Sequence, residues 1–324
     1  MSNQKYALGL VGVTGYTGME MLRCLQHHTA FELTTVTSRQ EAGKSVAKLF
    51  PQLQGTTVGN LVISKPDADQ LARDCDLVFL AVPHGTAMHM ASALVQRGVK
   101  VIDLSADFRL KSREIFETWY NCSHQAPELL AQAVYGLPEL YAADIAQAQL
   151  VANPGCYPTS VLLGLYPALQ NRLVHNQGIV ADSKSGASGA GRGAKVGTLF
   201  CEVSDTFKAY GLGTHRHTPE IDQEASRMAR QTVQVSFNPH LLPINRGILT
   251  TLYTMACTHT TLENLRQAYA DFDREHPWIR LQPQGNLPEL KNVRGTMYCD
   301  IGLVLDERTG RAIMVSAIDN LCRG

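Results

Sequence analysis

Residues 6–18 read YALGLVGVTGYTG, an apolar run that leads into a loop with a glycine at every third position. The run is typical of a buried β-strand, and the apolar spacing through Met19, Leu22 and Leu25 is helical. Glycines in such a loop let the backbone approach the pyrophosphate of a dinucleotide at the helix N-terminus. GxxGxxG alone is a weak motif, but this context favours a dinucleotide site over an ordinary strand–helix turn. The residues expected to bind are Gly12, Thr14, Gly15, Tyr16, Thr17 and Gly18.

Apolar runs and helical patterns alternate along the first half of the chain. Residues 31–37 are rich in β-formers, and residues 76–82 and 99–104 are continuous apolar runs, as in strands covered on both faces. A helical pattern over residues 86–97 separates the last two runs. This alternation predicts an α/β fold with a doubly wound parallel sheet.

The pattern changes after about residue 150. Residues 185–193 are rich in glycine, serine and alanine, and longer β-rich segments follow them. We therefore predict a second domain of the α+β class. Its expected elements are a strand at 248–257, an amphipathic helix at 261–275 and a strand pair at 297–305 and 312–318.

Length and charge narrow the class of protein. A chain of 324 residues suits two domains. Its 29 Lys and Arg residues balance 29 Asp and Glu residues, so no basic excess is present to neutralise nucleic acid. No apolar stretch approaches the roughly 20 residues of a membrane helix, and residues 1–5 are polar, unlike a secretory signal. We therefore expect a cytoplasmic protein that binds neither nucleic acid nor membranes.

One of the eight cysteines differs from the others in its setting. The set as a whole has no CxxC pair, and no HExxH occurs, so neither a disulfide framework nor a metal site is predicted. Residues 153–160, however, read NPGCYPTS ahead of an apolar run. Cys156 thus follows a Pro-Gly turn where a helix is expected to begin, and a helix N-terminus raises the thiolate fraction. Cys156 is a candidate nucleophile, and a small buried hydrophobe is the alternative.

The end of the second predicted strand indicates which dinucleotide is bound. An acidic residue there would bind the ribose 2′-hydroxyl of NAD, but the sequence is Thr37-Ser38-Arg39, with no acid before Glu41. A hydroxyl and a guanidinium suit the 2′-phosphate of NADP. We therefore predict NADP binding by Ser38 and Arg39, and a solvated loop charge is the alternative for Arg39.

Residues 215–220 read HRHTPE and follow a loop interrupted by glycines. A thiolate nucleophile needs a partner that moves protons near neutral pH, and histidine is the usual one. His215 and His217 are therefore candidates for this role, with a pair of surface histidines as the alternative.

Two arginines lie where a ligand could be held. Arg109 closely follows the apolar run at 99–104, at the edge where α/β sheets bind ligands, and Arg246 lies on a short turn before a strand. Each arginine alone is more often a structural ion-pair partner. Together with Cys156, they suggest a substrate that carries a phosphate and a carboxylate.

Taken together, these motifs resemble one known family across nearly the whole chain. The chain is similar to the N-acetyl-gamma-glutamyl-phosphate reductases of arginine biosynthesis, relatives of aspartate-semialdehyde and glyceraldehyde-3-phosphate dehydrogenases. NPGCYPT and HRHTPEI are its most specific matches. The matching stretches are Gly12–Gly18, Leu104–Leu110, Tyr135–Glu139, Asn153–Thr159, Ser185–Arg192, His215–Ile221, Asn245–Gly247 and Asp319–Leu321.

The resemblance implies a reaction and a role for each matching residue. The family reduces N-acetyl-L-glutamyl 5-phosphate with NADPH to N-acetyl-L-glutamate 5-semialdehyde and releases inorganic phosphate. Cys156 matches the nucleophile that forms a thioester, and His217 matches the acid/base, with His215 the less expected candidate and a substrate contact. Arg109 matches the residue that meets the substrate phosphate, and Arg246 the one that orients its carboxylate. The residues expected around phosphate and nicotinamide are Ser185, Gly186, Ser188, Gly189 and Asn320.

The resemblance also implies a domain plan and an assembly. It assigns residues 1–152 and 319–324 to a Rossmann-type NADP-binding domain. Residues 153–318 become a catalytic and oligomerisation domain with a mixed, mostly antiparallel sheet, and a homo-oligomer (dimer or tetramer) is expected. Family members continue past the position of Gly324 with a helix that returns onto the cofactor domain, so we expect a shortened chain. The alternatives are an enzyme like aspartate-semialdehyde dehydrogenase and a non-catalytic NADP-binding regulator.

Overall fold

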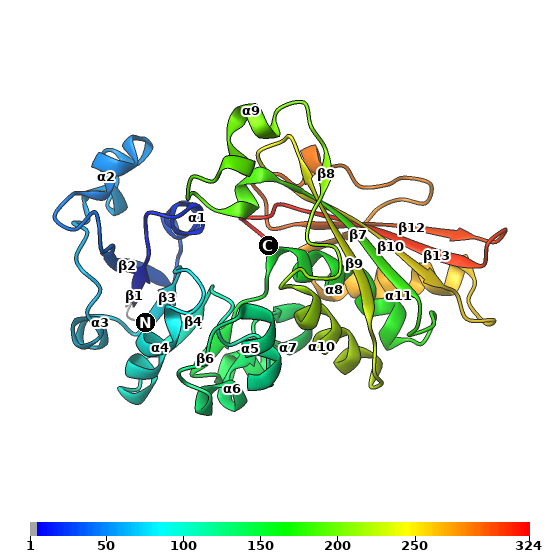
Figure 1. Ribbon diagram of the computed structural model, residues 1–324, viewed down its shortest axis with the longest axis horizontal. Coiled ribbons are helices and arrows are strands. Elements are labelled where there is room, and N and C mark those ends of the chain that lie inside the picture. The colour runs from blue at the N-terminus through cyan, green and yellow to red at the C-terminus, as the bar shows by residue number, and fades with distance from the viewer. Residues whose placement is uncertain (1–4) are drawn as a thin grey trace. The chain divides into compact units, whose positions relative to one another are not determined.

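The computed structural model describes residues 5–324, which divide into two compact units (Figure 1). The first unit ends at Pro154, and the second runs from Gly155 to Gly324. Residues 1–4, which belong to the predicted nucleotide-binding domain, lie outside the described residues. Residues 319–324 group with the second unit, whereas the sequence assigned them to the first domain. The physical reason is that Asp319 and Asn320 bond to loops of the second unit.

The first unit contains a six-stranded sheet in the order β2-β1-β3-β4-β6-β5, and its paired strands run parallel. The predicted strands at 6–11 and 31–37 coincide with β1 and β2. The doubly wound parallel sheet is therefore confirmed. Its strands are β1 (Tyr6–Val11), β2 (Phe31–Thr37), β3 (Leu77–Leu80), β4 (Lys100–Asp103), β5 (Val134–Tyr135) and β6 (Leu150–Ala152).

Helices cover the sheet of the first unit, and its core divides into two apolar clusters. One cluster contains Leu22 of α1 with Val36 of β2, and the other contains Met88 of α4 with Phe116 of α5. Two clusters that share one sheet are the expected result of covering both of its faces. The helices are α1 (Tyr16–Leu25), α2 (Val46–Leu49), α3 (Ala68–Asp74), α4 (Ala87–Gln96), α5 (Arg113–Tyr120), α6 (Glu128–Gln132) and α7 (Pro138–Gln147).

The second unit contains a seven-stranded sheet in the order β11-β12-β13-β10-β7-β9-β8. Pairs β7–β9 and β11–β12 are parallel and the other four pairs are antiparallel, which confirms the predicted mixed sheet. The strands are β7 (Ile179–Gly186), β8 (Lys208–Ala209), β9 (Val235–Leu242), β10 (Ile248–Met255), β11 (Ile279–Leu281), β12 (Cys299–Asp306) and β13 (Arg311–Ile318). The helices are α8 (Cys156–Gln170), α9 (Phe200–Val203), α10 (Thr218–Ala229) and α11 (Leu262–Glu275).

Helix α8 is almost wholly buried and packs against β10 and β13, with α10 and α11 beside it (Figure 1). Four buried hydroxyls fix it to the sheet. The Ser160 hydroxyl lies 2.9 Å from that of Thr250 and 2.7 Å from that of Ser316, and the Ser183 hydroxyl lies 2.8 Å from Thr250. Because a buried hydroxyl is costly without a partner, this network allows one register of α8 on the sheet.

Among residues 5–324, no helix combines the length and the apolar character that a membrane crossing requires.

Asp103, the last residue of β4, is a fully buried acid. Its carboxylate accepts hydrogen bonds from the Ser105 backbone N–H at 2.9 Å and from the Ser105 hydroxyl at 2.8 Å. Burial, with a smaller contribution from the charge of Asp107, raises the pKa of Asp103 to about 7. This acid therefore takes up a proton in the folded chain at a pH where it would be ionised in the unfolded chain.

We expect the contribution of Asp103 to the stability of the protein to fall as pH rises from about 4 to about 7, because Asp103 ionises late in the folded chain. An acid whose pKa is higher in the folded chain than in the unfolded chain stabilises the fold at a pH below its unfolded-state pKa. That contribution is lost as the pH rises through the folded-state pKa. Asp103→Asn cannot ionise at this position. The difference between its urea midpoint and that of the parent should therefore increase in favour of the variant from pH 5 to pH 8. The gain should be on the order of 2 kcal/mol. Asp74→Asn, at an exposed site, is the control, and parallel pH curves for parent and Asp103→Asn would contradict the expectation.

Candidate active site

Cys156 is the first residue of α8, and Gly155 is its N-cap, which confirms the predicted helix start. The thiol is partly exposed. The Gly155 carbonyl accepts the backbone N–H of Thr159 at 3.0 Å and its hydroxyl at 2.9 Å, so the first turn is well formed. Pro158 fits here because the amide it lacks would have had no helical partner. The cysteine therefore stands at the positive end of a long, rigid helix.

Glu220 supports the loop in front of Cys156, a role that no motif in the sequence predicts. Its side chain is fully buried in the first turn of α10, and its Oε1 accepts the Gly155 N–H at 2.8 Å. This bond joins α10 to the start of α8. A glutamate in the first turn of a helix is common because it complements the helix dipole, so its pattern gave no sign of this contact.

The two candidate histidines lie next to the residue that follows the cysteine. The ring centroids of His215 and His217 are 4.9 Å apart, and those of Tyr157 and His217 are 6.0 Å apart. His217 is the N-cap of α10, three residues before Glu220. The structure therefore brings the HRHTPE stretch beside Tyr157, in the first turn of the cysteine helix.

His215 differs from His217 in its electrostatics. Burial, and then the charge of Arg216, lower the pKa of His215 to about 4. Its Nδ1 accepts the backbone N–H of His217 at 3.1 Å, so the neutral ring carries its proton on Nε2. A ring that is neutral at pH 7 and is committed to a backbone bond is a poor base at that pH.

Two tyrosines complete this cluster. The hydroxyls of Tyr157 and Tyr210 are 2.9 Å apart, and the Tyr157 hydroxyl also donates to the His240 carbonyl at 3.2 Å. Burial raises the pKa of Tyr210 to about 12, so the phenol stays protonated at neutral pH. The Tyr157 ring packs edge-on against His215 and Phe237. These rings fix the orientation of the two imidazoles.

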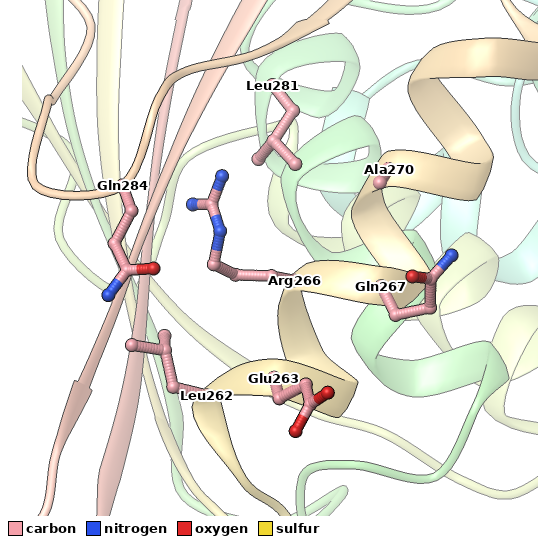
Figure 2. Close-up of a pocket in the computed structure, with 7 residues that line it drawn as sticks. All are labelled: Leu262, Glu263, Arg266, Gln267, Ala270, Leu281 and Gln284. Carbon is pink, nitrogen blue, oxygen red and sulfur yellow. The ribbon is translucent and has the colours of Figure 1, made fainter.

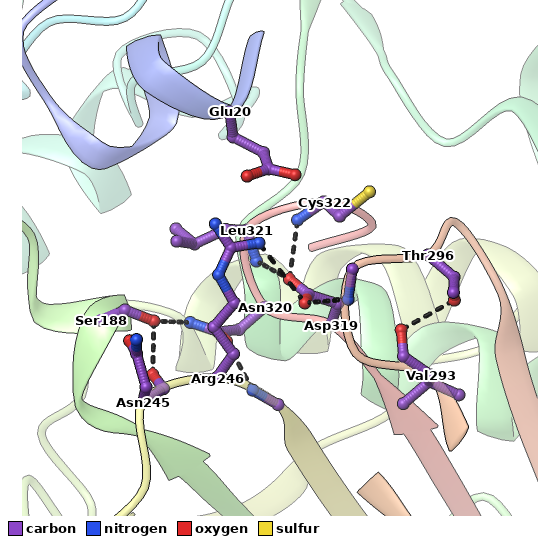
Figure 3. Close-up of polar contacts among 12 residues, drawn as sticks. Glu20, Ser188, Asn245, Arg246, Val293, Thr296, Asp319, Asn320, Leu321 and Cys322 are labelled. Atoms are coloured by element: carbon purple, nitrogen blue, oxygen red, sulfur yellow. Dashed lines mark hydrogen bonds and ion pairs between the residues drawn. The ribbon is translucent and has the colours of Figure 1, made fainter. Parts of the chain in front are cut away.

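The predicted residues of the second unit around Arg246 meet in one polar network (Figure 3). Ser188 donates its hydroxyl to the Asn245 carbonyl at 2.6 Å, and Asn320 donates to the Ser188 hydroxyl at 3.0 Å. The Asn320 side-chain oxygen accepts the Gly247 N–H at 2.7 Å. Close packing requires glycine at 186 and leaves little room at 189. A Cβ at Gly186 would meet the Asn245 carbonyl at 2.7 Å, and one at Gly189 would meet the Ser185 hydroxyl at 3.3 Å.

The glycine loop of the first unit has the form that a pyrophosphate needs. Gly12 has a φ of +91°, and a Cβ there would lie 2.2 Å from the Ala81 carbonyl oxygen. Gly15 is the N-cap of α1, whose first turn holds Tyr16 and Thr17 and no acid. Thr14 lies in the loop between them. The predicted loop is therefore positioned as a backbone cradle for an anion.

The end of β2 also suits a dinucleotide. The Thr37 hydroxyl, in a side chain only 1% exposed, has no hydrogen-bond partner among the described residues, and the Thr37 carbonyl accepts the Gly12 N–H at 3.1 Å. An unsatisfied buried hydroxyl beside such a loop is a position for a ligand group. Ser38 is buried, and its hydroxyl oxygen accepts the backbone N–H groups of Gln40 and Glu41 at 3.3 and 3.4 Å. Arg39 is exposed.

Arg109 has main-chain partners in the first unit. Its side chain is largely buried, its Nε donates to the Asn153 carbonyl at 2.7 Å, and its Nη2 donates to the Leu104 carbonyl at 3.2 Å. These bonds hold the end of β4 to the Asn153–Pro154 segment. The predicted contact of Arg109 with a substrate phosphate stays a prediction.

A hollow of about 530 Å³ lies elsewhere on the second unit (Figure 2). One side of it is the exposed face of α11, and the Arg266 guanidinium there donates to the Gln282 carbonyl at 3.2 Å. None of its lining residues belongs to the predicted site. They are Leu262, Glu263, Arg266, Gln267, Ala270, Leu281 and Gln284.

Comparison with known proteins assigns both halves of the chain. Residues 7–148 match the model of the semialdehyde dehydrogenase NAD binding domain, and residues 156–320 match that of the semialdehyde dehydrogenase dimerisation domain. The N-acetyl-gamma-glutamyl-phosphate reductase of Desulfotalea psychrophila is 50% identical over 98% of this chain and 91% of its own length. That of Geobacter sulfurreducens is 49% identical with the same coverage. The chain belongs to the N-acetyl-gamma-glutamyl-phosphate reductase family.

Solved structures support the fold of this reductase family member. Aspartate semialdehyde dehydrogenase II of Vibrio cholerae superposes with a TM-score of 0.75 at 15% identity, over 99% of this chain and 95% of that one. The Candida albicans aspartate semialdehyde dehydrogenase, solved with NADP, gives 0.68 at 14% identity, over 97% and 94%. The likeness at this identity concerns the fold alone. The family resemblance found in the sequence is confirmed by the more similar reductases.

Gly18→Ala should weaken NADP binding by about tenfold or more, because the new Cβ would lie 2.6 Å from the Gly12 carbonyl oxygen and 2.7 Å from that of Val13. Both neighbours are main-chain atoms, so the loop itself must move. Quenching of protein fluorescence by NADPH measures the dissociation constant. Gly197→Ala is the control, since Gly197 lies outside the loop and a Cβ there meets nothing within 4 Å. Equal affinities for the two variants would contradict the cradle.

Replacing the two histidines should separate their roles. His217→Asn should lower kcat by about a hundredfold or more, as for the loss of a general acid/base. His215→Asn keeps an oxygen that can accept the His217 N–H, so its kcat should fall by less than about tenfold. Because the pKa of His215 is about 4, its replacement should leave the pH profile between 5 and 8 unchanged. A lost limb of that profile in His215→Asn would reverse the assignment.

Proposed function

We propose that this chain reduces N-acetyl-L-glutamyl 5-phosphate to N-acetyl-L-glutamate 5-semialdehyde, with NADPH as the reductant and release of inorganic phosphate. The observation that carries the proposal is Cys156 at the start of α8 with the His215–His217 pair beside Tyr157. Relatives about 50% identical that carry the reductase name support the choice of substrate.

The first half-reaction is acylation of Cys156. The thiolate attacks the acyl carbon of the acyl phosphate, the C–O bond to phosphate breaks, and a thioester forms with inorganic phosphate as the leaving group. The oxyanion that develops is stabilised by backbone amides at the start of α8 together with His217. The Gly155 amide is not among these donors, because it donates to Glu220.

The second half-reaction returns the free thiol. When bound, the dinucleotide supplies the hydride for the thioester carbonyl. The tetrahedral adduct on Cys156 then breaks its C–S bond, and the aldehyde leaves as the thiolate is restored. His217 holds and moves the proton that balances the oxyanion, and His215 keeps its neighbour in place through its Nδ1.

Two arginines and the loop at Ser185–Gly189 bind the substrate and the nicotinamide in this proposal. Arg246 binds the carboxylate, for which a planar guanidinium is well suited. Arg109 meets the phosphate, and the main-chain bonds of its side chain fix the position of its charge. Ser185, Gly186, Ser188 and Gly189 surround the phosphate and nicotinamide, and Asn320 lies near the nicotinamide amide.

NADP is the expected dinucleotide, bound by the Gly12–Gly18 loop together with Ser38 and Arg39. The absence of an acid between Thr37 and Glu41 supports a 2′-phosphate over a free 2′-hydroxyl. The exposed Arg39 side chain can swing onto that phosphate.

We also infer a homo-oligomer, a dimer or tetramer, formed through the second unit. The match of residues 156–320 to a dimerisation domain supports this assembly. So does a run of exposed apolar side chains along one segment of the unit, because monomers rarely leave such a cluster in water. The exposed side chains are Val196, Leu199, Phe200, Phe207 and Leu212.

The reverse reaction tests the function directly. The parent protein should reduce NADP with N-acetyl-L-glutamate 5-semialdehyde only when inorganic phosphate is present, as followed by NADPH absorbance. Cys156→Ser should bind NADPH normally yet lose at least about a thousandfold in turnover, because a serine ionises little at pH 7 and its alkoxide leaves poorly. Retained turnover in Cys156→Ser would overturn the nucleophile.

Two further outcomes would point to other functions. Faster turnover with aspartate semialdehyde than with the N-acetylated glutamyl substrate would indicate an enzyme like aspartate-semialdehyde dehydrogenase. Tight NADPH binding without any acylation of Cys156, read by mass spectrometry, would indicate a non-catalytic regulator. Both outcomes contradict the proposed function.

A further inference from the structure

Asp319 is a buried carboxylate to which the functions above assign no role. It follows β13 directly and is fully buried. Its Oδ1 accepts the backbone N–H groups of Leu321 and Cys322, both at 2.9 Å. Its Oδ2 accepts the Gly295 N–H at 2.7 Å and lies 3.5 Å from Nη1 of Arg246 (Figure 3). One side chain therefore joins three segments that are distant in the sequence.

The main chain on either side of Arg246 is held separately from its side chain. Ser188 binds the Asn245 carbonyl through its backbone N–H and its hydroxyl, and Asn320 binds the Gly247 N–H. The Arg246 guanidinium, in a side chain 19% exposed, has Asp319 as an ion-pair partner. A guanidinium has five N–H donors in a planar fork, enough to serve a protein carboxylate and a ligand carboxylate together.

Asp319 also holds the C-terminal turn that contacts Cys156. The Asp319 carbonyl accepts the N–H groups of Arg323 and Gly324 at 3.1 and 3.0 Å. Gly324 is so close to Cys156 that a Cβ on it would be 2.8 Å from the Cβ of the cysteine. Asp319 thus has contacts that lead both to Arg246 and to the backbone beside Cys156.

We propose that Asp319 is a positioning residue that orients the Arg246 guanidinium toward the carboxylate of the substrate. The inference rests on the proposed function and adds to it the group that sets the direction of the carboxylate-binding arginine. Removing the negative charge removes the carboxylate that lies 3.5 Å from Nη1 and so loosens the orientation of the guanidinium. Binding of the substrate carboxylate should therefore become weaker. It should weaken equally in the ground state and the transition state, because the carboxylate is present in both.

The test is a comparison of KM and kcat in the phosphate-dependent reduction of NADP. Asp319→Asn should raise KM for N-acetyl-L-glutamate 5-semialdehyde by about tenfold, with kcat within about threefold of the parent and KM for NADP unchanged. Asp300→Asn is the matched control. Asp300 is also buried in the second unit and pairs with Arg280 at 2.6 Å, so its loss reports generic damage from a broken ion pair.

A double substitution shows whether Asp319 acts through the arginine. If it does, Arg246→Gln and the double variant Arg246→Gln/Asp319→Asn should have the same KM, because the second change has nothing left to disorient. Multiplicative effects on KM would overturn the proposal. So would an unchanged KM in Asp319→Asn, or an equal rise in Asp300→Asn.

Arg246→Lys carries the test if Asp319→Asn does not fold. A lysine keeps the positive charge beside Asp319 but lacks the planar fork, so the protein should fold and KM for the semialdehyde should rise. An unchanged KM in Arg246→Lys would overturn the proposal. Failure of the proposed function is separate, because it would appear as no phosphate-dependent reduction of NADP in the parent protein.

Discussion

The hydrogen bond between the buried Glu220 carboxylate and the Gly155 N–H is the contact on which the second unit's site depends. It joins the first turn of α10, with His217 as its N-cap, to the N-cap of the cysteine helix. A carboxylate with no exposed surface must keep a strong partner, because a buried charge without one is very costly. This bond helps to hold the start of α8, with Cys156, next to the start of α10, with His217.

Helix α8 is held at its other contacts by groups that leave little freedom. The Ser160, Ser183, Thr250 and Ser316 hydroxyls form one buried network across the helix and three strands. Tyr269 adds a bond from its hydroxyl to the Gly164 carbonyl at 2.6 Å. A satisfied polar network in an apolar core fixes one packing arrangement, since any shift of the helix would break several bonds at once. Catalysis by a helix N-terminus benefits from this rigidity, because the amides must already point to where charge develops.

Sequence reasoning succeeded where the signal is local. The strand at Tyr6–Val11 follows from apolar composition, that at Phe31–Thr37 from β-forming residues, and the start of α8 from a Pro-Gly turn. It missed Glu220 and Tyr210 because their roles depend on partners 65 and 53 positions away. From the residues alone it could not separate His215 from His217, since both are histidines of one motif, and only the family resemblance favoured His217. Only burial, the charge of Arg216 and the backbone bond of Nδ1 distinguish the two rings.

The same limit explains why charged residues are the hardest to assign from a pattern. The sequence places Arg109 at the ligand-binding edge of a sheet and Arg246 on a short turn before a strand. Their partners in the structure include two main-chain carbonyls for Arg109 and a carboxylate for Arg246. A guanidinium paired with a carboxylate is locally neutral until a ligand carboxylate arrives, and the direction in which it points then decides how that ligand binds. Asp319 therefore lowers the attraction of the arginine for anions in general but gives its guanidinium a defined direction. A carboxylate in the right position is then favoured over other anions.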